Sequence, residues 1–469
     1  MDFPKKASRR SFLTQASWMG AASVITNPLD ASAGKTKSTR PAARAKNLIF
    51  LVADGMGTGT LSLTNHWSLR HQNRPTHWMD LYNQPGWVNS LQDTASASSS
   101  VTDSAAAASA WGSGQRVNNR SINYSTGGKA LEPIFVTAKK AGKATGLVST
   151  CRITHATPAA FVANMENRDE EDAIAEQYLQ REMDVYLGGG LRHFQSKKRD
   201  LLPAFIQKGY DVCRNVPDLI NTDERRSRLI GLFSDGHLPY AIDRANDPSL
   251  WDIPSLEQMF QSSLDTLSDR PEGFVLQVEA GRVDHAGHVN DPATILQEQL
   301  EFDRCIPIAV DFQERNPDTL VIVTTDHGTG GCQFNGLGDG YNGSDAALDR
   351  INRFTGSFES LEKVFRKNGN FDRRLFQQVT GIEANEEQVD KIQADIERGQ
   401  KYLTSTLADL FTTELMKTCG VGWTSHQHTA EHVEFLARGP GADAIPRRFD
   451  NNQLHGCMIA ALGLDHARQ

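Results

Sequence analysis

The sequence predicts an α/β fold, specifically a three-layer sandwich in which helices flank a large, mainly parallel central sheet. Two observations lead to this prediction. Continuous apolar runs of strand length recur along the 469 residues, as in strands that are buried on both faces of a parallel sheet. Stretches of helical periodicity separate those runs, and such alternation is typical of parallel strands that are joined by helices.

The predicted strands begin with the apolar run NLIFLVA at 47–53. Similar runs follow at 146–150, 184–187, 273–278, 319–324 and 433–436. Helical patterns between them include 170–181 and 292–315. We expect the carboxyl ends of the parallel strands to meet at one edge of the sheet, where ligands bind in open α/β folds.

The composition is that of a folded, acidic protein. Hydrophobic residues make up 39% and charged residues 23%, which allows a packed core and excludes global disorder. Acidic residues outnumber basic ones by 57 to 49, so no broad nucleic-acid-binding surface is expected. No apolar stretch reaches the roughly 18 residues that a membrane-spanning helix needs. The length fits one large α/β domain with an insertion better than two or three separate domains.

The N-terminal residues 1–33 are predicted to be an export signal. The pattern SRRSFL at 8–13 precedes a weakly apolar stretch, and ASA at 31–33 provides a small-residue cleavage site. This order resembles a twin-arginine signal, which predicts a periplasmic or secreted protein; a basic tail without an export role is the alternative. A polar, basic linker at 34–46 separates the signal from the folded domain, expected over 47–469.

The stretch 333–425 is predicted to be an insertion of helices and loops near the ligand-binding edge. It starts with a Gly-rich loop at 336–343 and continues as a charged, amphipathic helix at 386–398. The loop lacks the spacing of an EF-hand, so we interpret it as a surface loop rather than a calcium site. The insertion fits two roles, a cover over the site or a contribution to a homodimer.

Carboxylates and histidines lie next to several predicted strands. They are Asp54 after the first strand, Glu279, Asp284, His285 and His288 after the 273–278 strand, Asp326 and His327 after the 319–324 strand, and His426 and His428 before the last strand. Such side chains bind zinc and magnesium through carboxylate oxygen and imidazole nitrogen. Singly, each has a simpler role as a helix cap or a core residue, but together they predict metal binding at one sheet edge. Asp284 and His288 would meet one ion if they occupied a helical turn.

Ser104 is the candidate nucleophile. It opens an Ala-rich stretch of helix-forming composition, after Thr102 and Asp103, which are typical of helix caps. The free N–H groups at a helix start would hold a phosphate there, whereas the composition alone is explained by a capped helix. No Gly-x-Ser-x-Gly motif surrounds Ser104, so activation by a metal fits better than a hydrolase triad. Arg168 is the candidate for gripping two phosphate oxygens.

Together these motifs resemble the alkaline phosphatases. The matching segments, in the family's order, are DGMG at 54–57, VTDSAA at 101–106, ATPAA at 156–160, VE at 278–279, VDHAGH at 283–288, TDHG at 325–328 and HT at 428–429. The resemblance implies hydrolysis of small phosphate monoesters through a phosphoserine on Ser104, with Arg168 holding the phosphate. It also implies two zinc ions, one held by Asp284, His288 and His428 and the other by Asp54, Asp326 and His327. A magnesium ion would be held by Asp54, Thr157 and Glu279.

Two positions depart from the pattern of the best-known enteric bacterial members. His155 stands where that pattern has Asp, and His285 stands where it has Lys. Both resemble the histidine-containing variant of animal and some bacterial members, which leaves magnesium and zinc as alternatives for the third ion. We expect both residues on the phosphate side of the site or just behind it. His426 and His432 match no family role and are expected at the surface or behind the metal ligands.

Other functions fit part of the same pattern. A phosphodiesterase or sulfatase of the same superfamily would share the metal ligands, but Arg168 favours monoesters, and a sulfatase's modified residue has no matching motif here. An exported phosphate- or metal-binding protein would have no use for Ser104. The six cysteines form no Cys-x-x-Cys pair, so no thiolate zinc site is predicted, and their number is compatible with disulfides or with free thiols.

Overall fold

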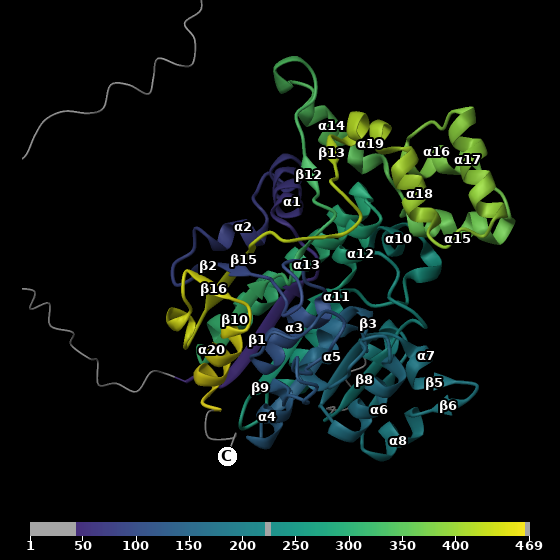
Figure 1. Cartoon of the computed structure of the whole chain (residues 1–469). Coiled ribbons are helices and arrows are strands. Elements are labelled where there is room, and N and C mark those ends of the chain that lie inside the picture. The colour runs from purple at the N-terminus through teal and green to yellow at the C-terminus, as the bar shows by residue number, and fades with distance from the viewer. Residues whose placement is uncertain (1–43, 221–226, 465–469) are drawn as a thin grey trace, which may run out of the picture. The chain divides into compact units, whose positions relative to one another are not determined.

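A ten-stranded sheet with helices on both faces forms the centre of the fold (Figure 1). This computed structural model describes residues 44–220 and 227–464. The predicted export signal, and the linker up to residue 43, lie outside the described residues. The three layers confirm the α/β sandwich that the sequence predicts.

The sheet is parallel apart from one strand. Its order is β16-β2-β15-β10-β1-β9-β3-β4-β8-β7, and β15 runs antiparallel to both of its neighbours. The strands are β1 (Asn47–Ala53), β2 (Val88–Asp93), β3 (Ala144–Arg152), β4 (Val185–Gly189), β7 (Asp211–Cys213), β8 (Leu229–Leu232), β9 (Phe274–Ala280), β10 (Thr319–Thr324), β15 (Val433–Arg438) and β16 (Arg448–Asp450). In register, Ile49 of β1 pairs with Val321 of β10 and Leu276 of β9.

All six predicted strands are present, and β1 and β10 have the predicted bounds. The sequence did not predict β2, β7, β8 and β16. Three of these have only three or four residues, and β2 alternates between buried and exposed positions. Continuous apolar runs mark strands that are buried on both faces, so a search for them misses short or one-sided strands.

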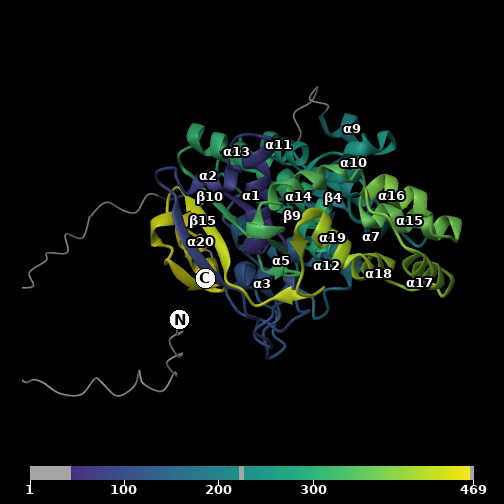
Figure 2. The same ribbon diagram turned by 90° about the horizontal axis from the view of Figure 1, so that it is seen from above.

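The sheet separates two hydrophobic cores, because alternate residues of a strand point to opposite faces. In β1, Ile49 and Leu51 join one core, whereas Phe50 and Val52 join the other. The first core packs against α1 (Thr58–His71), α2 (His77–Leu81), α11 (Leu256–Leu267) and α13 (Pro292–Arg315). The second packs against α3 (Ser104–Ser113), α4 (Ile134–Lys140), α5 (Ala156–Val162), α6 (Glu171–Arg181) and α20 (Gln453–Leu462). Figure 2 shows α11 and α13 on one side of the strands and α3 and α5 on the other.

Shorter elements complete the main body around the sheet. They are α7 (Leu191–Phe194), β5 (Gln195–Ser196), β6 (Arg199–Asp200), α8 (Leu202–Gln207), α9 (Val216–Ile220), α10 (Ala241–Asn246), α12 (Arg282–His288), β11 (Gly328–Thr329) and β14 (His428–Thr429). Of these, α12, β11 and β14 carry or flank predicted metal ligands.

Helices fill most of the predicted insertion at 333–425, at the upper right of Figure 1. They are α14 (Ser344–Arg350), α15 (Phe358–Asn368), α16 (Arg373–Thr380), α17 (Glu386–Glu397), α18 (Leu403–Leu410) and α19 (Thr412–Cys419). Buried aromatic rings hold them together, as in the stacked pair Phe376 and Phe411, whose centroids lie 4.5 Å apart. At its two ends, β12 (Gln333–Phe334) pairs with β13 (Val421–Gly422), so the segment leaves and returns at neighbouring points. Its status as an insertion stays a prediction.

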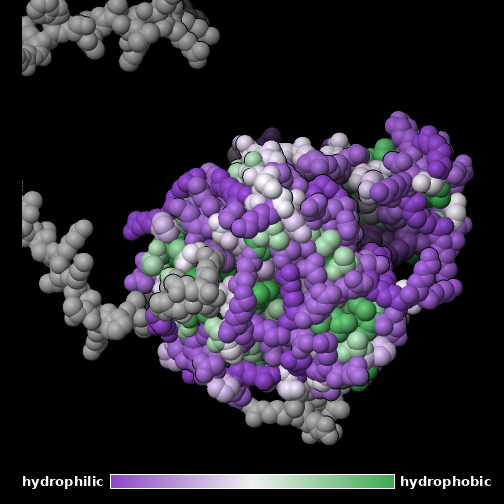
Figure 3. All heavy atoms as spheres, turned by 60° about the horizontal axis from the view of Figure 1, so that its bottom comes forward, coloured by the Kyte–Doolittle hydropathy of each residue, from purple (hydrophilic) through white to green (hydrophobic). Residues whose placement is uncertain are grey.

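No helix among the described residues combines the length and the apolar character needed to cross a bilayer. The face drawn in Figure 3 is largely hydrophilic, with small apolar patches between the polar side chains.

Candidate active site

The carboxyl ends of three adjacent strands bring three carboxylates together. The strands β10, β1 and β9 lie side by side, and Asp54, Glu279 and Asp326 lie at or just beyond their ends. All three carboxylates are fully buried. Gly55 allows α12 to approach this edge, since its φ is +74° and a Cβ there would lie 2.6 Å from the Cα of Asp284.

Group A consists of Asp284, His288 and His428. Because α12 places Asp284 and His288 one turn apart, His288 Nε2 lies 3.4 Å from Asp284 Oδ1. His428 Nε2 lies 3.5 Å from the same oxygen and 3.0 Å from His288 Nε2. His428 reaches this place because β14 pairs with β11, which directly follows His327.

Two backbone carbonyls set the orientation of the imidazoles in group A. His288 Nδ1 donates to the carbonyl of His426 at 2.6 Å, and His428 Nδ1 donates to the carbonyl of Thr102 at 2.8 Å. A carbonyl oxygen only accepts, so in each neutral ring Nδ1 carries the proton and Nε2 presents a lone pair. In that neutral form the two lone pairs face each other beside a carboxylate oxygen, an arrangement that a bound cation would stabilise.

Group B consists of Asp54, Asp326 and His327, whose ligand atoms lie within 4.8 Å of one another. His327 Nε2 is 3.3 Å from Asp326 Oδ2 and 3.6 Å from Asp54 Oδ1. The backbone N–H groups of Gly55 and His327 both donate to Asp326 Oδ1 at 3.0 Å, which leaves Oδ2 for the group. Burial holds the pKa of His327 well below its ordinary value, so this ring is neutral and able to bind a metal.

Group C consists of Asp54, His155 and Glu279, and it shares Asp54 with group B. Thr157 Oγ1 donates to Asp54 Oδ2 at 3.3 Å, which places the predicted magnesium ligand beside the group. The hydroxyl of Ser149, on the neighbouring strand β3, donates to Glu279.

The electrostatics of groups B and C fit bound cations. Burial, followed by the charges of Asp326 and Asp284, holds the pKa of Asp54 well above its ordinary value. Burial also raises the pKa of Asp326 to about 8 and that of Glu279 to about 7. One atom each of Asp54, Asp326, Glu279 and His155 is buried without a hydrogen-bond partner. Buried polar atoms without partners are costly, and divalent cations would satisfy all of these at once.

Ser104 and Arg168 lie beside the three groups. Asp103 caps α3 by accepting a hydrogen bond from the backbone of Ala106, and Ser104 is the first helical residue. Ser104 Oγ lies 3.2 Å from His327 Nε2. Arg168 is held at the same helix start, because it donates to Asp103 Oδ2 at 2.9 Å and faces His155 Nε2 at 3.0 Å.

The structure thus brings the predicted nucleophile, arginine and metal ligands to one place, whereas His285 lies behind His155. Their ring centroids are 5.6 Å apart. Of the two unassigned histidines, His432 is exposed and His426 supports group A, since its ring faces the carbonyl of His288 at 2.7 Å. The catalytic and metal-binding roles of these residues stay predictions.

Sequence reasoning missed two residues that support the ligands. Thr329 Oγ1 donates to Asp284 Oδ1 at 2.6 Å, and Ser149 donates to Glu279. Little in the sequence marks Ser149, because the buried strand β3 also contains the polar residues Thr145 and Thr150. Thr329 left only its position, two residues after His327.

Fold and site together define a class of protein, an α/β sandwich that carries candidate metal-ligand groups and a buried serine at the carboxyl edge of its sheet. Comparison with known proteins then identifies the family. A sequence model described as alkaline phosphatase matches residues 45–464. The chain belongs to the alkaline phosphatase family and is accordingly a hydrolase of phosphate esters.

Individual relatives agree with this assignment. Alkaline phosphatase 3 of Bacillus subtilis is 31% identical over 470 residues, which cover 98% of this chain and 97% of the relative. The crystal structure of Thermus thermophilus alkaline phosphatase is similar with a TM-score of 0.83 at 35% identity, over 90% of this chain and 93% of that chain. A cold-active alkaline phosphatase from Shewanella gives a TM-score of 0.75 at 30% identity, over 89% of this chain and 99% of that chain.

Proposed function

We propose that this chain is a metal-dependent phosphomonoesterase in which Ser104 is the nucleophile. The observation that carries the proposal is the position of Ser104 Oγ, 3.2 Å from a ligand atom of group B and at the N-terminus of α3. A buried serine there has no structural partner other than His327 among the hydrogen bonds of the described side chains. Its placement fits attack on phosphorus.

The metal assignments follow the three groups. Group A and group B would each hold a zinc ion, and group C with Thr157 would hold magnesium, with zinc as the alternative because His155 supplies a nitrogen ligand. When bound, the metals neutralise charge on the entering and leaving oxygens of the phosphoryl transfer.

The side chains of the chain itself perform the remaining tasks. Ser104 Oγ loses its proton and forms a bond to phosphorus while the bond to the leaving oxygen breaks. The leaving oxygen takes up a proton, which gives a phosphoserine and an alcohol. Water then breaks the serine–phosphorus bond and releases inorganic phosphate. Arg168, fixed by Asp103, would grip two phosphate oxygens in both steps, and the free N–H groups of α3 add positive potential.

Phosphate monoesters are the substrates that this arrangement favours. A monoester offers two charged oxygens beyond the reacting ones, whereas a diester lacks one of them, so Arg168 loses part of its grip. A phosphodiesterase or sulfatase of the same superfamily, and a non-catalytic binding protein, remain as alternatives for the experiment to exclude.

The test compares a chromogenic monoester with the corresponding diester, with and without a chelator. We expect turnover of the monoester that the chelator abolishes and zinc restores. Ser104→Ala is expected to lose most turnover and to keep its metal content, while Ser113→Ala, at the other end of α3, serves as a matched control. Full activity after complete removal of metal, or normal activity of Ser104→Ala, would refute the mechanism.

We also propose that the protein is exported through the signal at 1–33 to the periplasm or the medium. The twin-arginine pattern in the sequence supports this proposal. Replacement of Arg9 and Arg10 by lysine should retain the protein in the cytoplasm in a fractionation assay. A homodimer is a further expectation, which sedimentation would test.

A further inference from the structure

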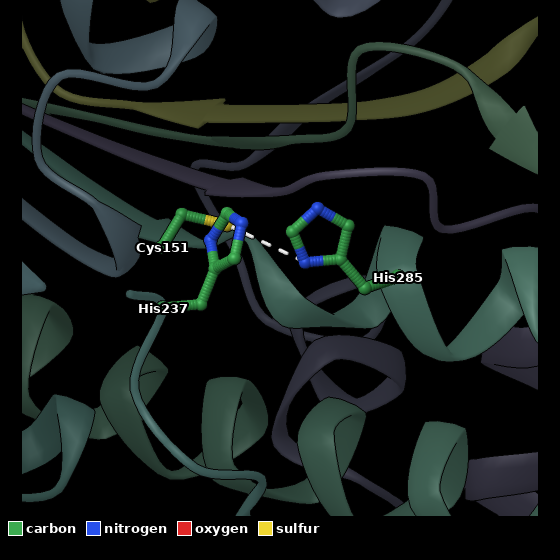
Figure 4. A group of neighbouring side chains, drawn as sticks. All are labelled: Cys151, His237 and His285. Atoms are coloured by element: carbon green, nitrogen blue, oxygen red, sulfur yellow. Dashed lines mark hydrogen bonds between the residues drawn. The ribbon is translucent and has the colours of Figure 1, made fainter. Parts of the chain in front are cut away.

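A fourth cluster of metal-ligating side chains lies beside the three groups and has no part in the proposed reaction. It consists of Cys151 of β3, His237 of the loop between β8 and α10, and His285 of α12, and one ligand atom of each lies within 4.8 Å of the others. Figure 4 shows the three side chains converging. Cys151 Sγ lies 3.8 Å from His285 Nδ1.

The distance between Cys151 Sγ and His285 Nδ1 is close to that of two ligand atoms in a tetrahedral metal site. Zinc binds thiolate sulfur at about 2.3 Å and imidazole nitrogen at about 2.0–2.1 Å, which places the two ligand atoms about 3.6 Å apart at a tetrahedral angle. The sulfur–nitrogen distance in the structure exceeds this value by a few tenths of an ångström. A thiolate with two imidazoles selects zinc and similarly soft cations over magnesium.

The backbone holds the three ligands in place before any ion binds. Thr150 is the neighbour of Cys151 in the chain. The carbonyl of Thr150 accepts a hydrogen bond from the backbone N–H of Leu238, and the hydroxyl of Thr150 accepts one from the backbone N–H of Arg282. One residue thus connects the segments that carry His237 and His285. The loop also lies against β4, where a Cβ at Gly189 would come within 2.2 Å of the carbonyl of Gly236.

Two arginines flank the cluster, and each is neutralised by a carboxylate. Arg152 contacts the ring of His237 and pairs with Glu171, while Arg282 donates to His285 Nδ1 at 3.0 Å and pairs with Glu359. The backbone N–H of Arg152 also donates to His237 Nδ1 at 3.2 Å. Because a neutral imidazole has one lone pair, an ion bound to His237 replaces this hydrogen bond, and an ion bound to His285 Nδ1 replaces the one from Arg282. The arginines keep their carboxylate partners, and the thiolate offsets one of the two positive charges of the ion.

An ion can reach the cluster from solvent. His237 and His285 line a cavity of about 500 Å³, which also borders Tyr402 and Ser405 near the start of α18. The cavity provides an entry path to the two imidazoles. Zinc sites with three protein ligands bind a further molecule, such as water, at the fourth position.

We propose that Cys151, His237 and His285 bind a fourth metal ion, a zinc-like divalent cation, through one thiolate and two neutral imidazoles. On binding, the sulfur–hydrogen bond of Cys151 is replaced by a sulfur–metal bond, and one proton is released to solvent. The site shares no residue with groups A, B and C. The proposal departs from the expectation of no thiolate zinc site, which rested on the absence of neighbouring cysteine pairs, because the fold brings the other candidate ligands from distant segments.

Sulfur provides a selective test, since the ligands of groups A to C are oxygen and nitrogen. X-ray absorption of the zinc-loaded full chain should show a zinc–sulfur distance of about 2.3 Å. Cys151→Ala should abolish that signal and lower the metal content by one equivalent, and His237→Gln should also lose one equivalent. Cys457→Ala, a cysteine outside the cluster, should leave both measurements unchanged.

A second measurement keeps the proposal testable if a variant fails to fold. Titration of the metal-free wild type with Co²⁺ alone should produce a thiolate-to-cobalt charge-transfer band in the near ultraviolet. A wild-type protein without zinc–sulfur scattering and without this band would overturn the proposal. Both measurements are independent of Ser104, so a failure of the phosphatase mechanism would not affect them.

Discussion

Replacing Asp326 with asparagine is expected to stabilise the metal-free protein and to destabilise the zinc-loaded protein relative to wild type. The two backbone hydrogen bonds to Asp326 Oδ1 can persist with an amide oxygen. Oδ2 has no partner, whereas an amide NH₂ at that position can donate to Asp54 Oδ1, which also lacks one. The variant removes the negative charge that a cation in group B would neutralise.

The magnitude follows from the raised pKa of Asp326. Burial moves this pKa from 3.8 in the unfolded chain to about 8 in the folded, metal-free chain. The folded state then holds a proton that the unfolded state releases. The contribution of Asp326 to wild-type stability is therefore full below about pH 4, falls by about 1.4 kcal/mol per pH unit and levels off above about pH 8. Because neighbouring carboxylates share these protons, we expect an advantage of roughly 3–5 kcal/mol for Asp326→Asn at about pH 9.

Urea denaturation at about pH 5, 7 and 9, with chelator and with excess zinc, measures this difference. In chelator the advantage of the variant should grow with pH. In zinc the order should reverse, because an ion that binds only the folded state adds its binding free energy to stability. Asp390→Asn, at an exposed position of α17, is the control. An advantage that does not change with pH would refute the raised pKa, and the same order in zinc would remove Asp326 from the ligands.

Three further substitutions test other parts of the structure. Arg168→Ala should lower kcat/KM for monoesters by roughly 100-fold or more, because hydrogen bonds between charged groups contribute about 1.5–3 kcal/mol each; a loss below tenfold in steady-state assays would contradict the phosphate grip. His426→Ala should weaken zinc binding to group A by about 10- to 100-fold in chelator competition, while the exposed His432→Ala should not; equal affinities would contradict its supporting role. Arg244→Met should cost about 3–5 kcal/mol in urea denaturation by leaving the buried carboxylate of Glu301 unpaired, and adding Glu301→Gln should recover part of the loss; no recovery would contradict this explanation.

The sequence predicted the centre of the fold better than its margins. The bounds of β1, β10 and α13 match the prediction, since these elements are long and strongly apolar or periodic. The strands β7 and β16 were not predicted, because three residues are too few to show the alternation or the apolar run that distinguishes a strand from a loop.

Metal ligands were predictable from the sequence where they directly follow an apolar strand, as Asp54 and Asp326 do. It was not predictable where partners come from segments that are distant in sequence. His426 supports His288 across 138 residues, and nothing in the local sequence of either residue indicates the other. The cluster around Cys151 was not predicted for the same reason, because its two histidines come from distant segments and have no characteristic spacing from the cysteine.

The pairing of β11 with β14 has a consequence for assembly. Thr329 and His428 are cross-strand neighbours, although about 100 residues separate them in the chain, and closing so long a loop carries an entropic cost that depends on its length. An ion in group A would tie His428 to Asp284 and His288 in the folded state, and so act as a reversible cross-link over that loop, comparable to a disulfide. The proposed phosphate chemistry and the stability of the closed loop between Thr329 and His428 would then depend on the same ion.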